Sequence, residues 1–126
     1  MMKNRIKLEY TINCSPNVLY KQLSTPSGLS EWFADDVNLK GNVFTFIWDG
    51  SEEQAEMISG KENKFVRFRW LASDDKDAFF EFKINKHELT GDVALEIVDF
   101  ADEDDVDDAR DLWDTQISRL KHTMGL

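Results

Sequence analysis

Hydrophobic and polar side chains alternate along most of this chain, beginning near its first residues. In residues 3–14, Ile6, Leu8, Tyr10 and Ile12 alternate with polar or charged side chains. A period of two residues places these four side chains on one side of an extended backbone. The segment is therefore predicted to be a strand with one buried and one solvated face.

Two short helices are predicted directly after this strand. Ser15 and Pro16 make a typical helix start, with the serine as N-cap and the proline at the first helical position. The apolar residues that follow predict one short helix, which ends before Pro26. A second helical turn is predicted over residues 27–33, which carry Leu29, Trp32 and Phe33.

From Asp36 onward the hydrophobic period is two again, and it predicts six further strands. These strands are predicted at residues 37–40, 43–49, 52–60, 64–71, 78–86 and 89–100. Short segments with turn residues separate them, such as Asp49-Gly50 and the polar stretch 73–77. Connections this short require antiparallel neighbours, because parallel strands need longer crossovers.

The last segment, residues 107–124, is the only long one with helical periodicity. Its apolar residues are Ala109, Leu112, Trp113, Ile117, Leu120 and Met124. They predict a helix of about 27 Å with one broad apolar face, which needs a partner of comparable size. Only the sheet is large enough. The sequence therefore predicts a single α+β domain over residues 1–126, with this helix across a seven-stranded antiparallel sheet.

Strand parity also predicts which side chains face the helix. The predicted inward set is Phe44, Phe46, Trp48, Ala55, Met57, Val66, Phe68, Trp70, Phe80, Phe82, Ile84, Val93, Leu95 and Ile97. The opposite face carries Arg67, Arg69, Glu81 and Lys83, and it is predicted to be solvated. The aromatic residues of the inward set can either fill the space under the helix or line a pocket there.

Composition limits the classes of function. The formal net charge of −10 disfavours binding to nucleic acid or anionic lipid, because such a surface repels phosphates. No apolar run approaches the roughly 20 residues that a membrane span needs. The first residues lead into the strand rather than into an apolar signal segment, so a cytoplasmic location is expected. A single cysteine, Cys14, excludes an internal disulfide.

No arrangement of residues predicts a metal site, a cofactor or a catalytic group. The acidic run from Asp99 to Asp111 lacks the glycine and the closing glutamate of a calcium loop. It is interpreted as a solvated helix start, where the helix dipole favours negative charge. Among the strand acids, parity places Glu56 and Glu96 on the outer face, and Glu53 stays open as an inward-facing acid.

The order of elements and several aromatic positions resemble a known family. Residues 10–16, the Leu-Ser-Glu-Trp-Phe turn at 29–33 and the terminal helix with Leu112-Trp113 are similar to the START-like superfamily, also called SRPBCC. The branch that includes activators of the heat-shock-protein-90 ATPase is the most similar. The resemblance implies a helix-grip fold, in which a bent seven-stranded sheet wraps around the C-terminal helix. It also implies an apolar cavity between the two.

Three functions follow as hypotheses. The first is a non-enzymatic domain that binds a small hydrophobic or aromatic ligand under the helix, with Trp32 at the mouth. The expected ligand-binding residues are Trp32, Trp48, Phe68, Trp70, Phe82, Trp113 and Ile117. The second is a protein-interaction module with a filled core and an exposed Trp32/Phe33 patch. The third is a cyclase or hydrolase, which would need a polar side chain inside the cavity.

Overall fold

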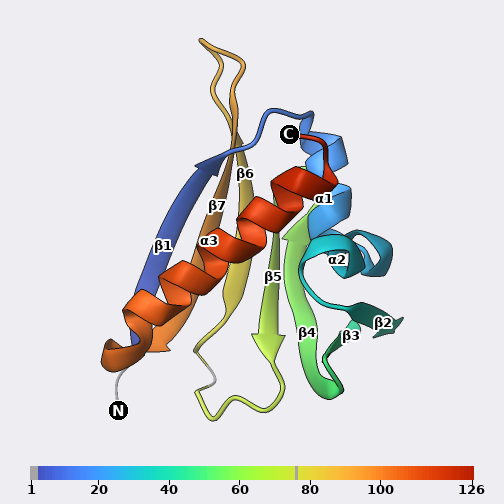
Figure 1. Cartoon of the computed structure of the whole chain (residues 1–126), viewed down its shortest axis with the longest axis vertical. Coiled ribbons are helices and arrows are strands. Elements are labelled where there is room, and N and C mark those ends of the chain that lie inside the picture. The colour runs from blue at the N-terminus through green and yellow to red at the C-terminus, as the bar shows by residue number, and fades with distance from the viewer. Residues whose placement is uncertain (1–2, 76) are drawn as a thin grey trace.

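The chain folds around one antiparallel sheet whose inner face is crossed by the C-terminal helix (Figure 1). The computed structural model describes residues 3–75 and 77–126. Residue 76, within the predicted polar stretch 73–77, and residues 1–2 lie outside this described part. The seven strands follow the order β1-β7-β6-β5-β4-β3-β2, and every neighbouring pair is antiparallel. The strands are β1 (Lys3–Thr11), β2 (Asp36–Lys40), β3 (Val43–Trp48), β4 (Ser51–Lys61), β5 (Phe65–Trp70), β6 (Phe80–Lys86) and β7 (Val93–Asp102).

Two short helices, α1 (Pro16–Ser24) and α2 (Pro26–Trp32), connect β1 to β2, as predicted. Each begins with a proline, whose fixed φ suits the first helical position. The side chain of Thr25 caps α2 by accepting a hydrogen bond from the Gly28 amide at 3.0 Å. Gly28 also lets the helices approach closely, since a Cβ there would lie 2.2 Å from the carbonyl oxygen of Lys21. The Ser15 side chain makes no such cap at α1.

The C-terminal helix α3 (Val106–Thr123) follows a short 3₁₀ turn, η1 (Glu103–Asp105). It buries Trp113, Ile117 and Leu120 against the inner face of the sheet. Burying side chains of this size contributes about 1.5–3 kcal/mol each, so packing rather than helix propensity holds α3 in place. Acidic residues lie in its first turn and basic residues in its last, which the helix dipole favours at both ends.

The arrangement is the predicted helix-grip fold, with the expected inward side chains in its core. Phe44, Phe46, Phe68, Phe80 and Phe82 are almost completely buried between sheet and helices. A β-bulge between Met57 and Ser59 shifts the register of β4 against β5, and such bulges bend the strand that carries them. The sheet therefore curves around α3 rather than lying flat beneath it.

Two details of the prediction are wrong. The last strand begins at Val93, not at residue 89, because residues 87–92 close a hairpin loop in which the His87 amide donates to the Asp92 carbonyl at 2.8 Å. Leu89 in that loop is fully exposed. The outer face is also not uniformly solvated. Glu81 is buried there under an ion pair with Arg67 at 2.9 Å, and the Arg67 guanidinium lies 4.0 Å from the centre of the Phe79 ring.

Candidate functional site

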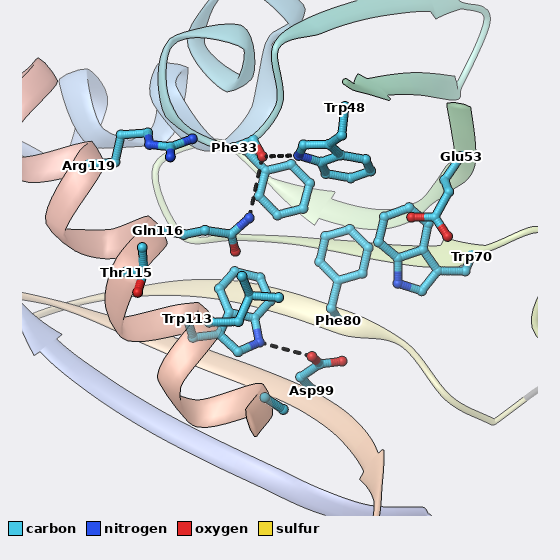
Figure 2. A pocket seen from close by; sticks show the side chains of 12 residues that line it. Phe33, Trp48, Glu53, Trp70, Phe80, Asp99, Trp113, Thr115, Gln116 and Arg119 are labelled. Carbon is cyan, nitrogen blue, oxygen red and sulfur yellow. Dashed lines mark hydrogen bonds between the residues drawn. The ribbon is translucent and has the colours of Figure 1, made fainter. Parts of the chain in front are cut away.

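A pocket of about 550 Å³ opens between α3 and the inner face of the sheet. Five rings form most of its wall, and Ala109 and Leu112 of α3 add aliphatic surface. The rings are those of Phe33, Trp48, Trp70, Phe80 and Trp113. The polar lining consists of Glu53, Asp99, Thr115, Gln116 and Arg119. Figure 2 shows these side chains around the pocket.

The end of α2 fixes one side of this wall. A helix leaves its last carbonyl groups without partners inside the helix. At the C-cap of α2, the Phe33 carbonyl oxygen accepts hydrogen bonds from Trp48 Nε1 at 2.7 Å and from Gln116 Nε2 at 3.4 Å (Figure 2). The two donors come from β3 and α3. One carbonyl thus connects three elements at the pocket and holds the Trp48 ring in a defined orientation.

The rings also pack on one another. The Phe33 and Trp113 rings are stacked with centroids 5.9 Å apart, and the Trp70 and Phe80 rings lie 4.9 Å apart. Trp48 and Trp70 are neighbours at 6.2 Å. Aromatic pairs in such geometries add about 0.5–1.5 kcal/mol beyond the apolar area that they bury. The rings of the wall therefore support one another through their own packing.

Asp99 brings a carboxylate into this aromatic surrounding. It lies on the inner face of β7, opposite Ile6 of β1. Its Oδ2 accepts a hydrogen bond from Trp113 Nε1 at 2.9 Å, and its Oδ1 accepts one from the Phe100 amide at 2.8 Å. Burial raises the pKa of Asp99; the two hydrogen bonds and the charge of Lys3 oppose this rise. The site therefore contains an anion that is only partly compensated.

The exposed lining residues define the mouth of the pocket. Leu112, Thr115 and Arg119 project from α3 on one side, and Glu53 projects from β4 on the other. Glu53 faces inward, since it lies opposite the buried Phe46 in the β3–β4 pairing. A ligand entering here would pass between a helix that carries a cation and a strand that carries an anion.

The residues expected from the sequence divide into two groups. Trp48, Trp70 and Trp113 line the pocket. Phe68, Phe82 and Ile117 lie in the closed core with at most 1% of their surface exposed. The structure also places Trp32 in this core rather than at the mouth. Trp32 is 1% exposed, and its Nε1 donates to the Gln22 carbonyl at 2.8 Å.

One acid of the site, Asp99, differs from its sequence interpretation, and a second, Glu53, had been left open. Asp99 falls at the end of the predicted strand 89–100, yet it was interpreted with the acidic run as part of a solvated helix start; in the structure it lies within β7 and faces the pocket. The alternation Val93, Leu95, Ile97 extended by one more step would have indicated this. Glu53, left open by the pattern, also lines the pocket. The contributions of Gln116 and Arg119 had no signal in the sequence, because both look like ordinary polar positions of an amphipathic helix.

Residues 3–75 and 77–126 show neither a cluster of metal ligands nor a membrane-spanning helix. No group of three or more His, Cys, Asp or Glu side chains among them could hold a metal ion. No helix in this described part is long and apolar enough to cross a membrane. The aromatic pocket with its carboxylates is the site that the geometry defines.

Fold and pocket together define a helix-grip protein with an aromatic site. The whole chain, residues 1–126, matches the model of the START-like superfamily domain, and the protein belongs to that superfamily. No curated protein matches the chain.

Several solved structures are similar. A protein from Bacteroides fragilis, determined by NMR in solution, is 42% identical over 100% of this chain and 94% of its own, with a TM-score of 0.71. The Aha1 dimer from Colwellia psychrerythraea is 19% identical over 94% of this chain and 93% of its own, with a TM-score of 0.78. DynU16, from the dynemicin biosynthetic locus, is 12% identical over 96% of this chain and 47% of its own, with a TM-score of 0.80. The last two similarities show the fold alone.

Proposed function

We propose that this protein is a binding domain for a small aromatic ligand held between α3 and the sheet. The observation that carries the proposal is the pocket of about 550 Å³ walled by Trp48, Trp70 and Trp113. Ligand pockets in proteins usually have volumes of roughly 300–1,000 Å³ and consist of apolar walls with a few polar groups. A flat ligand would stack on rings that are already in place, so binding costs little reorganisation.

The role is proposed as binding rather than catalysis. Among the described residues, Asp99 accepts hydrogen bonds from the Trp113 indole and the Phe100 amide, neither of which titrates. These donors fix the orientation of the carboxylate. They suit a group that recognises a ligand.

The protein-interaction hypothesis loses its apolar patch and keeps only the acidic surface as support. That hypothesis needs Trp32 and Phe33 as an exposed patch, yet only 1% and 3% of their surfaces are accessible. Phe33 instead packs against Phe46, Phe80 and Trp113. The pair attaches α2 to the core, and it offers a partner no apolar surface.

Binding is tested by calorimetry with α-methylnaphthalene, a flat and uncharged probe. We expect saturable binding to the wild-type protein and a loss of at least about tenfold in affinity in Ala109→Phe, which fills the pocket from α3. Leu71→Ala is the matched control, because Leu71 is exposed and lies outside the lining. Equal affinity in all three proteins would mean that the probe binds outside the pocket, which would contradict the proposal. Absence of binding to the wild type would reject the proposal.

A further inference from the structure

We infer that the pocket selects a flat aromatic cation, a ligand whose positive charge lies within or beside a ring system. This inference rests on the proposed function and specifies the chemical class of the ligand. It is drawn from three properties of the pocket: the position of its charged groups, the bonding of Asp99 and the nature of the rings.

The charged groups are separated along the pocket. Figure 2 shows Asp99 and Glu53 at the side bounded by Trp70, whereas Arg119 lies on α3 at the other side. Arg119 is six residues beyond Trp113, the partner of Asp99, which corresponds to about 9 Å along the helix. The half of the pocket between Trp70 and Trp113 therefore carries two carboxylates and is distant from the guanidinium.

Asp99 forms no ion pair within the described residues, and the charge of Lys3 acts on it only from a longer distance. Both of its hydrogen-bond donors, the Trp113 indole and the Phe100 amide, are neutral. The ion pairs found within residues 3–75 and 77–126 involve Glu56, Glu81 and Glu96 instead. Each carboxylate oxygen has acceptor capacity for more than one donor, so Asp99 can still accept from a ligand. A carboxylate that is partly buried without a direct ion-pair partner is costly, and a bound cation would relieve that cost.

The rings favour the same ligand charge. A cation over the face of an aromatic ring is attracted by the quadrupole of that ring, and tryptophan gives the strongest interaction. The pocket has three tryptophans in its wall. The net charge of −10 adds a long-range attraction for cations that come from solution. Arg119 would attract an anionic ligand, but it is exposed to solvent and therefore screened, as Glu53 is, whereas Asp99 is partly buried.

The test compares probes of nearly the same shape and different charge. N-methylquinolinium is a permanent cation, α-methylnaphthalene is its neutral counterpart, and α-naphthoate is an anion. Calorimetry at about pH 8, where an aspartate is ionised in most settings, gives the three affinities. We expect the cation to bind the wild-type protein about tenfold or more tightly than the neutral probe, and the anion to bind most weakly.

Variants then assign this preference to the carboxylates. In Asp99→Asn, which keeps an acceptor for Trp113, we expect the preference for the cation to fall to about threefold or less. The affinity for α-methylnaphthalene should stay within about twofold, which also reports that the pocket is intact. Glu52→Gln is the control, because it removes one charge from β4 beside Glu53 but on the outer face. It should keep the preference of the wild type.

The possible results separate this inference from the proposed function. If the wild type binds α-methylnaphthalene as tightly as the cation, or prefers α-naphthoate, the inference is wrong and the binding function stands. If none of the probes binds, both are wrong. If Asp99→Asn does not fold, Glu53→Gln and the comparison of probes on the wild type still decide. If neither Asp99→Asn nor Glu53→Gln changes the preference for the cation, the inference is also wrong.

Discussion

The Trp113 indole donates a hydrogen bond to Asp99 across the space between α3 and β7, with Nε1 and Oδ2 2.9 Å apart. This contact joins the helix to the sheet at the pocket. It presents the carboxylate toward a ligand, and it holds a tryptophan ring in the pocket wall. Fold and site therefore share one polar contact, and changes to it should alter stability as well as binding.

Trp113→Phe keeps a ring at this position but removes the donor. Leaving a buried acceptor without its donor costs about 1–3 kcal/mol, so we expect the free energy of unfolding to fall by that amount. In the background of Asp99→Asn the same substitution should cost less, because the acceptor is no longer charged. Chemical denaturation of the four proteins in this double-mutant cycle measures the coupling. A coupling energy of zero would mean that the hydrogen bond adds nothing to stability.

Asp99→Asn should also change how stability depends on pH. Burial raises the pKa of Asp99 above its ordinary value of 3.8. Between the unfolded and the folded pKa the folded protein binds more protons, so this group makes stability fall as pH rises. The variant lacks this effect. Its free energy of unfolding relative to the wild type should therefore increase between about pH 3.5 and about pH 7, measured without ligand. A constant or decreasing difference would contradict the raised pKa.

Substitutions at two apolar residues of α3 distinguish the closed core from the pocket. Ile117 is 1% exposed in the closed core, so Ile117→Ala should lower stability by about 2–5 kcal/mol. Leu112 lies at the pocket mouth and is 59% exposed, so Leu112→Ala should change stability by less than about 0.5 kcal/mol. The same Leu112 variant should bind α-methylnaphthalene more weakly. Denaturation and calorimetry on both variants test this division, and equal stability losses would contradict it.

Gly28→Ala tests the close contact between α1 and α2. The added Cβ would lie 2.2 Å from a backbone oxygen, which cannot move aside as a side chain could. We expect a loss of stability of about 1–3 kcal/mol, measured by denaturation. Ser27→Ala is the control, because Ser27 is an exposed neighbour in the same helix. If both substitutions are neutral, the two helices are not packed as closely as described.

The sequence predicts the fold well because strands and the long helix show different hydrophobic periods. The inward set from Phe44 to Ile97 follows from alternation alone, and the long apolar face of residues 107–124 requires the sheet as its partner. Turn residues and short connections then determine the antiparallel order. The order of the elements, together with several aromatic positions, indicated the superfamily.

The site was predicted only in part, for two physical reasons. Parity indicates the face of a strand but not the position along it. Phe68 and Trp70 share a face, yet Phe68 lies in the closed core and Trp70 in the pocket. The second reason concerns Asp99. A carboxylate beside many others suggests a solvated run, and this signal outweighed the strand alternation, which places Asp99 on the inward face.

The central claim is that the tryptophan-lined pocket binds a flat aromatic molecule, and the indole signals in a ¹H–¹⁵N NMR titration test it most directly. The chain has four tryptophans, of which Trp48, Trp70 and Trp113 line the pocket while Trp32 lies in the core. On addition of N-methylquinolinium or α-methylnaphthalene, the account predicts saturable shifts of the three pocket signals and a nearly unchanged Trp32 signal. Four unchanged signals, or a shift of Trp32 alone, would contradict it.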